Sequence, residues 1–135
     1  MIHIPNNFLT VKYKGARIPG VENQADLTLG ANCQVFAYEL LRVNGLDAPN
    51  LRSSELWSDT LYSTVTDSLQ PLDLMLYNPD NNAFGAHVGV YIGKGKIIHL
   101  SFQNQIPEII EHINMMDNEK YHIFIGAKRI FKTEN

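Results

Sequence analysis

Two short apolar runs joined by glycines decide how this chain can fold: His87-Val88-Gly89-Val90-Tyr91-Ile92, then Gly93-Lys94-Gly95, then Lys96-Ile97-Ile98-His99. Apolar runs of this length, rich in Val and Ile and bounded by turn residues, are typical of β-strands. Side chains alternate between the two faces of a strand, so each run puts a histidine on a defined face. The stretch therefore predicts an antiparallel hairpin that carries one histidine on each strand.

The length of the turn decides whether the two histidines meet. A two-residue loop in a regular hairpin would send them to opposite faces of the sheet. A three-residue loop, Gly93-Lys94-Gly95 with Gly95 in the left-handed conformation, pairs Gly89 with His99 instead. We expect the three-residue loop, which makes His87 and His99 diagonal neighbours on one face.

The single cysteine of the chain, Cys33, lies at the start of a predicted helix. Asn32 can cap that helix, apolar residues recur at helical spacing after it, and Asn44-Gly45 supplies a left-handed stop, which places the helix at about 32–44. Unpaired backbone N–H groups and the positive end of the helix dipole stabilise a thiolate in the first turn. We therefore expect the pKa of the Cys33 thiol to be lowered.

The remaining segments complete an α+β pattern. The chain before the helix, residues 13–30, is rich in turn residues and reads as an irregular loop. After the helix the pattern predicts a short helix from Ser53 and strands at 74–77, 87–92 and 96–101. Residues 108–116 fit a helical turn or a strand, and 121–131 supply the last strand or two. A helix followed by an antiparallel sheet is the α+β arrangement, and we expect one domain over residues 1–135.

Composition excludes several classes of function. With 135 residues, 44% hydrophobic residues and a net charge of -3, the chain suits one soluble domain and carries no basic field for nucleic acid or a membrane surface. One cysteine excludes an internal disulfide and leaves a zinc site short of thiolates, so no metal and no cofactor are expected. The start of the chain has no signal-peptide pattern, which predicts a cytoplasmic protein or export by a route other than Sec.

The chemistry-bearing residues form a nucleophile, a base and an orienting group. Cys33 would be the nucleophile, and its own backbone N–H would stabilise the oxyanion. His87 would take the thiol proton and return it to the leaving amine. His99 would accept a hydrogen bond from the distal ring nitrogen of His87 and fix its tautomer.

The same residues resemble the NlpC/P60 cysteine peptidases. Their string His-Val-Gly-Ile-Tyr-Leu-Gly-x-Gly-x-x-Ile-His is matched over residues 87–99, and the similarity runs from about Asn32, through Leu69-Gln70-Pro71-Leu72-Asp73-Leu74, to the final strand ending at Arg129. The resemblance implies a papain-like core in which the helix bearing the nucleophile packs on an antiparallel sheet. It also implies Cys33, His87 and His99 as the catalytic residues.

The resemblance further suggests which residues contact the substrate. The family's Asp-Cys-Ser-Gly is Asn32-Cys33-Gln34-Val35 here, and in many members that Asp and Ser help to hold the free amine of a peptidoglycan stem peptide. Asn32 and Gln34 are therefore the candidate substrate-binding residues. Tyr13 is a third candidate, because it is the single tyrosine before Cys33 and family members carry an upstream active-site tyrosine.

The leading interpretation is a thiol hydrolase that cleaves an amide through an acyl-enzyme, with a peptide or peptidoglycan fragment, such as a γ-D-glutamyl bond, as substrate. An acyltransferase or a glutamine deamidase would use the same three residues. A different class is a metal-binding module in which Cys33, His87 and His99 hold zinc, and another is a partner-binding domain. If the protein is an exported effector, an inhibitor or immunity protein would be its partner.

Overall fold

The computed structural model describes residues 2–132, so the predicted domain at 1–135 extends past the described part by residue 1 and residues 133–135. Its sheet has six antiparallel strands in the order β1-β6-β2-β3-β4-β5. The strands are β1 (Ser63–Thr66), β2 (Leu74–Asn78), β3 (His87–Gly93), β4 (Lys96–His99), β5 (Glu108–Glu111) and β6 (Ile123–Ile130). The α-helices are α1 (Cys33–Val43), α2 (Ser53–Ser58) and α3 (His112–Met115), and the 3-10 helices are Asn6–Thr10, Leu27–Leu29 and Glu119–Tyr121.

The helix α1 begins and ends where the sequence predicts. The Asn32 side chain accepts a hydrogen bond from the backbone N–H of Val35 at 2.9 Å, which satisfies one of the free N–H groups of the first turn. At the other end the N–H groups of Gly45 and Leu46 donate to the carbonyls of Arg42 and Leu41, and Gly45 has φ 89°. These bonds form the left-handed stop expected from Asn44-Gly45.

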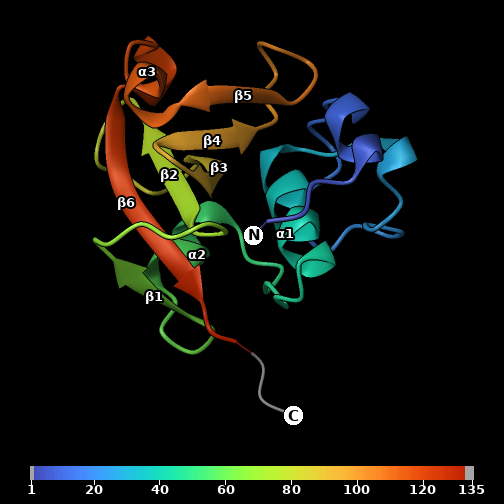
Figure 1. Ribbon diagram of the computed structural model, residues 1–135, viewed down its shortest axis with the longest axis horizontal. Helices are drawn as coiled ribbons and strands as arrows, with labels where there is room; N and C mark the ends of the chain where they lie inside the picture. Colours follow the sequence, from blue (N-terminus) through green and yellow to red (C-terminus); the bar gives the residue numbers. More distant parts are fainter. Residues whose placement is uncertain (1, 133–135) are drawn as a thin grey trace.

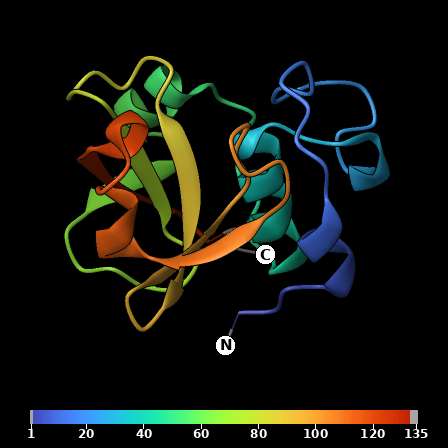
Figure 2. The same ribbon diagram turned by 90° about the horizontal axis from the view of Figure 1, so that it is seen from above.

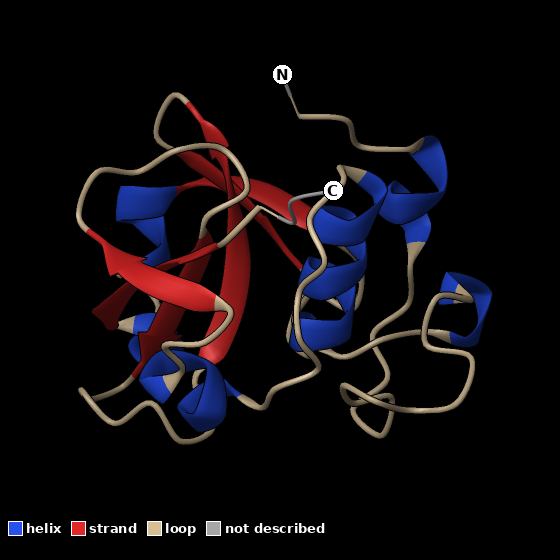
Figure 3. Cartoon of the chain, turned by 90° about the horizontal axis from the view of Figure 1, so that it is seen from below, coloured by secondary structure: helices blue, strands red, loops and turns tan. Residues whose placement is uncertain are grey.

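The surroundings of α1 differ from those of an ordinary surface helix. Its residues from Gln34 to Leu41 are all buried. Figures 1 and 2 show why: α1 lies between the sheet on one side and the N-terminal segments on the other. Phe8, Val11 and Leu27 of those segments join the same apolar core as Val88 and Val90 of β3. In Figure 3 the strands gather on one side of the molecule, and α1 with the N-terminal loops forms the other side.

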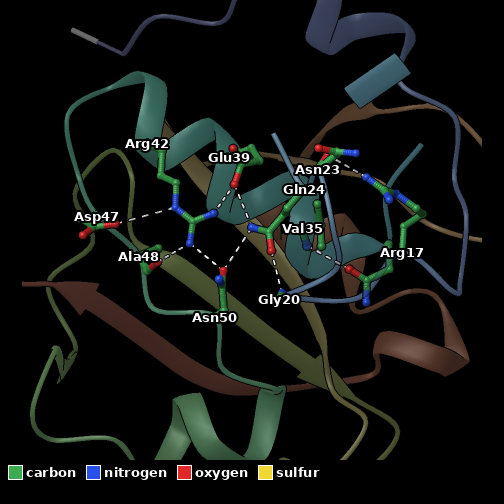
Figure 4. A network of polar contacts seen from close by, with 11 residues as sticks. Arg17, Gly20, Asn23, Gln24, Val35, Glu39, Arg42, Asp47, Ala48 and Asn50 are labelled. Atoms are coloured by element: carbon green, nitrogen blue, oxygen red, sulfur yellow. Dashed lines mark hydrogen bonds and ion pairs between the residues drawn. The ribbon is translucent and has the colours of Figure 1, made fainter. Parts of the chain in front are cut away.

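Burial of α1 places a carboxylate, Glu39, inside the protein, where it needs polar partners. Gln24 of the N-terminal loop donates to Glu39 Oε2 at 2.8 Å, and Arg42 forms an ion pair with the same oxygen. Arg42 also donates to Asn50 Oδ1 at 2.6 Å. Figure 4 shows Glu39 between Gln24 and Arg42, with Asn50 in contact with both. The network ties the loops before and after α1 to the helix.

The hairpin has the predicted register but a different turn. Val90 pairs with Ile98 and Tyr91 with Ile97, as the three-residue loop requires, yet Gly93 pairs with Lys96. The loop therefore contains two residues, Lys94 and Gly95, and the expected pairing of Ile92 with Lys96 is wrong. Ile92 is the extra residue of a β-bulge, and that bulge returns the strands to the register that puts both histidines on one face.

Two further elements differ from the sequence prediction. β1, over Ser63–Thr66, was not predicted, because its Ser and Thr residues lack an apolar run, but it pairs with β6 along its whole length. Residues 108–116 contain both alternatives in succession, a strand over Glu108–Glu111 and a helical turn over His112–Met115. Within residues 2–132, no helix combines the length and the apolarity needed to cross a bilayer.

The turn makes a direct prediction about stability. Lys94 and Gly95 have φ 53° and 78°, the pair of positive values that a type I′ turn requires. A β-branched residue is strained there, so Gly95→Val should lower the free energy of unfolding by about 1–2 kcal/mol in a urea titration. Lys94→Asn is the matched control, because Asn tolerates this conformation. An equal loss from both substitutions would contradict the assigned turn.

Candidate active site

Cys33 is the first residue of α1, and the segment before it is held against the N-terminal chain. Tyr13 forms a parallel bridge with Ala31. The N–H of Lys14 donates to the Ala31 carbonyl at 2.8 Å, and the N–H of Ala31 donates to the Lys12 carbonyl at 3.1 Å. This pairing fixes the direction in which the chain enters the helix. The Cys33 side chain is half-buried at that point.

His87 and His99 meet as the predicted register requires. His87 Nε2 lies 2.8 Å from His99 Nδ1, and the two rings are nearly perpendicular at 85°. Both side chains are buried, with His99 only 3% exposed. Ser53 Oγ accepts the N–H of Ala86 at 3.1 Å and so fastens the chain immediately before His87. The base and orienting roles of the two histidines remain predictions.

The carboxylate of Glu108, which the sequence analysis did not identify, lies beside His99. His87, His99 and Glu108 thus form a row of three side chains in hydrogen-bond contact. Glu108 pairs with His99 across β4 and β5, and its Oε1 lies 3.0 Å from His99 Nε2. Its side chain is 40% exposed, whereas that of His99 is 3% exposed. The sequence left 108–116 open between helix and strand, so no cross-strand partner could be assigned. Alternation within a strand at 108–111, paired with 96–99, is the signal that would have found it.

Tyr121 is a second residue that the sequence missed. Its ring stacks on His87 with centroids 4.5 Å apart and an angle of 26°. Burial raises the pKa of the Tyr121 hydroxyl, and a hydrogen bond with the Ser101 side chain acts in the opposite direction. Tyr121 closes a 3-10 helix far along the chain, where no local pattern links it to the hairpin. It covers one face of the candidate base.

A cavity of about 350 Å³ lies beside Cys33. Cys33 and His87 both line it, together with Tyr13, Ser101 and Tyr121. The placement of Tyr13 agrees with the expectation that it contacts the substrate, although that role remains a prediction. A larger cavity of about 640 Å³ adjoins it on the side of His99 and Glu108, and the two share Ser101, Gln103, Lys120 and Tyr121.

The other two candidate binding residues lie elsewhere. Asn32 uses its side-chain oxygen to cap α1, and its side chain does not line the cavity. The buried Gln34 amide donates to the Leu51 carbonyl at 3.2 Å and accepts from Arg52 Nε at 3.4 Å. Gln34 therefore points toward the chain ahead of α2 and not toward Cys33. The structure does not bring these two side chains into the cavity, because helix capping and the contact with residues 51–52 engage them.

The electrostatics of Cys33 contradict the expected lowering of its pKa. Burial raises the pKa of the thiol, and this effect outweighs the backbone N–H groups of Val88, Gln34 and Cys33 and the positive charge of Arg52. The pKa of His87 is lowered well below its ordinary value by burial and by repulsion from His99. Both shifts favour a neutral thiol beside a neutral imidazole in the resting protein.

The zinc alternative requires at least three protein ligands around one metal ion. Within the described residues 2–132, no three His, Cys, Asp or Glu side chains are arranged to hold a metal ion. His87 and His99 instead direct ring nitrogens at each other.

Alkylation of Cys33 tests the raised thiol pKa. In native protein, the rate of reaction with iodoacetamide should rise with pH and reach its midpoint above the free-thiol value of about 8.5. Arg52→Ala should move the midpoint to still higher pH, because the arginine charge favours the thiolate. Lys96→Gln removes an exposed cation at the turn end of β4 and should leave it unchanged. A midpoint below the free value would contradict the neutral pair.

Acid should destabilise the protein through the buried histidines. Histidine in the unfolded chain titrates near ~6.5, whereas the pKa values of His87 and His99 are lowered in the folded state. Below that pH the unfolded state binds protons that the folded state excludes, so Tm should fall as pH decreases from about 6.5 to 5. His87→Gln should make Tm less dependent on pH in this range, and His122→Gln, at an exposed site, should not. An identical pH dependence for wild type and His87→Gln would contradict the burial effect.

Comparison with known proteins identifies the fold. No family model matches the sequence, and no curated protein matches it. A solved NlpC/P60 family protein from Bacillus cereus is similar with a TM-score of 0.62 and 24% identity, over 90% of this chain and 36% of that one. NlpC2 from Trichomonas vaginalis has a TM-score of 0.62 and 15% identity, over 95% of this chain and 43% of that one.

A third similar structure is the NlpC/p60 domain of the peptidoglycan hydrolase SagA, with a TM-score of 0.52 and 18% identity, over 79% of this chain and 82% of that domain. This chain thus spans less than half the length of the first two structures. The fold expected from the sequence is confirmed: the chain has an α+β fold of the NlpC/P60 type.

Proposed function

We propose that this protein is a thiol hydrolase that cleaves an amide bond through an acyl-enzyme on Cys33. The observation that carries the proposal is the hydrogen bond of 2.8 Å between His87 Nε2 and His99 Nδ1, beside a cavity that Cys33 and His87 share. With Nε2 engaged by His99, the other ring nitrogen of His87 is available to accept a proton. A cysteine, a base and an orienting group are the three parts that nucleophilic acyl transfer requires.

In the proposed reaction, Nδ1 of His87 takes the proton from Cys33 Sγ as sulfur attacks the carbonyl carbon of the substrate. The backbone N–H of Cys33 donates to the oxyanion that develops. The C–N bond then breaks, and the proton on His87 passes to the leaving amine. Water attacks the thioester with His87 again as base, which releases the acid and restores the thiol.

The proposed substrate is a peptide bond of a peptidoglycan stem, such as the bond that follows γ-D-glutamyl. One of the similar structures is the domain of a peptidoglycan hydrolase, which supports this class. Among the described residues, those that line the cavity beside Cys33 include Tyr13 and the cation Lys120 but no carboxylate. With Asn32 and Gln34 engaged elsewhere, we do not propose that these side chains hold a free substrate amine.

Substitution of the three residues tests the division of roles. Cys33→Ala and His87→Ala should each reduce kcat/KM for a γ-D-glutamyl peptide by about 10³-fold or more, because the two groups act as a unit. His99→Ala should cost less and His99→Gln less still, because glutamine restores a hydrogen-bonding group. Product formation is followed by mass spectrometry, and His122→Ala is the control expected to match wild type.

Two results would contradict the proposal. Retention of cleavage by Cys33→Ala would exclude a covalent role for the thiol. Equal, mild losses for the two histidines would exclude the base and orienter assignment. Addition of an amine to the assay separates hydrolysis from acyl transfer, because a transferase would form a new amide in place of the free acid.

A further inference from the structure

We propose that Glu108 is a positioning residue that fixes the tautomers of His99 and, through it, of His87. The proposal rests on the proposed function, since it concerns the state of the candidate base. Strand pairing places Glu108 directly opposite His99. Its carboxylate contacts His99 alone of the two histidines, at 3.0 Å from Nε2. It lies outside the cavity that Cys33 lines and so acts through His99 rather than on substrate.

The Glu108 carboxylate determines which ring nitrogen of each histidine carries the proton. A carboxylate can only accept a hydrogen bond, so His99 must carry its proton on Nε2, the nitrogen that faces Glu108. In neutral His99 the other nitrogen, Nδ1, is then an acceptor. That nitrogen lies 2.8 Å from His87 Nε2, so His87 must donate from Nε2. Neutral His87 is thereby left with a lone pair on Nδ1.

Without the carboxylate, nothing in the row fixes which histidine donates the hydrogen bond between the two rings. Two neutral imidazoles can share one proton either way, with His87 as donor or as acceptor. In the second arrangement His87 carries its proton on Nδ1 and cannot accept one there from a thiol. Glu108 disfavours this second arrangement. In that arrangement two acceptors, His99 Nε2 and the Glu108 oxygen, would face each other at 3.0 Å.

Charge acts in the same direction as proton placement. Burial lowers the pKa of His99, and the Glu108 carboxylate raises it by a hydrogen bond and by charge. The rings of His87 and Tyr121 pack edge-on with the His99 ring, and the cavity beside Glu108 is also lined by Asp117, Glu119 and Lys120. Among the carboxylates of residues 2–132, Glu108 is the one within hydrogen-bond distance of either histidine, so it is the one that compensates a proton arriving on His87.

Nitrogen-15 NMR of the two imidazole rings tests the assignment without any substrate. At a pH where both rings are neutral, wild type should show Nε2–H tautomers for His99 and His87. Glu108→Ala should give mixed tautomers for both, and Glu108→Gln should give a mixture in which Nε2–H still dominates, because the amide oxygen can still accept. Glu111→Gln is the matched control: it neutralises a glutamate of the same strand whose partner across β4 is Lys96, and wild-type tautomers should persist.

Kinetics supply the second readout. Glu108→Ala should lower kcat by about 10–100-fold, the range found when a carboxylate that orients a metal-binding histidine is removed, with KM nearly unchanged. Glu111→Gln should change neither constant, and circular dichroism checks that β5 persists in every variant.

Wild-type tautomers in Glu108→Ala would overturn the role of Glu108 even if the enzyme cleaves its substrate. Equal losses of kcat in Glu108→Ala and Glu111→Gln would also overturn it, because the loss of a negative charge anywhere on β5 would then explain the lower kcat. If wild type cleaves no amide, the proposed function fails, and the tautomer measurement still decides for or against Glu108.

Discussion

A single hydrogen bond, between His87 Nε2 and His99 Nδ1, depends on the register of two strands, and the function that we propose for the cavity beside Cys33 rests on it. A shift of one residue would turn His99 to the opposite face of the sheet and leave His87 without a partner. The bulge at Ile92 prevents that shift, because it adds one residue to β3 beside a two-residue turn. A local irregularity near the turn therefore sets the contact between the two histidines at the other end of the hairpin.

The start of α1 and the burial of the site act on Cys33 in opposite directions. Backbone N–H groups favour a thiolate there, but removal from water disfavours any charge, and burial is the larger effect. The same loss of solvent lowers the pKa of His87. A neutral pair is thus the stable resting state, and in the proposed reaction the proton would move as sulfur attacks. A carboxylate beyond His99 then compensates the charge that His87 acquires.

Some parts of this arrangement follow from local sequence. Asn32 and Gly45 bound α1 because capping and a left-handed stop are properties of single residues. The contact between the histidines follows from the alternation of side chains along the strands. The predicted turn is wrong, because the sequence cannot distinguish a loop of three residues from a loop of two residues beside a bulge. Glu108 was missed for a different reason: eight residues, 100–107, separate His99 from the strand that begins at Glu108, and no turn rule fixes a register across them.

The position of Cys33 depends on a close passage of the chain that Gly30 makes possible. Gly30 has φ 88°, and a Cβ there would lie 2.4 Å from Lys14 Cγ and 3.0 Å from the Lys12 carbonyl oxygen. Only glycine allows these two segments to run side by side. That passage carries Tyr13 to the cavity and delivers Cys33 to the start of α1. The irregular loop before the helix is therefore part of the candidate site, because one contact places both Cys33 and Tyr13.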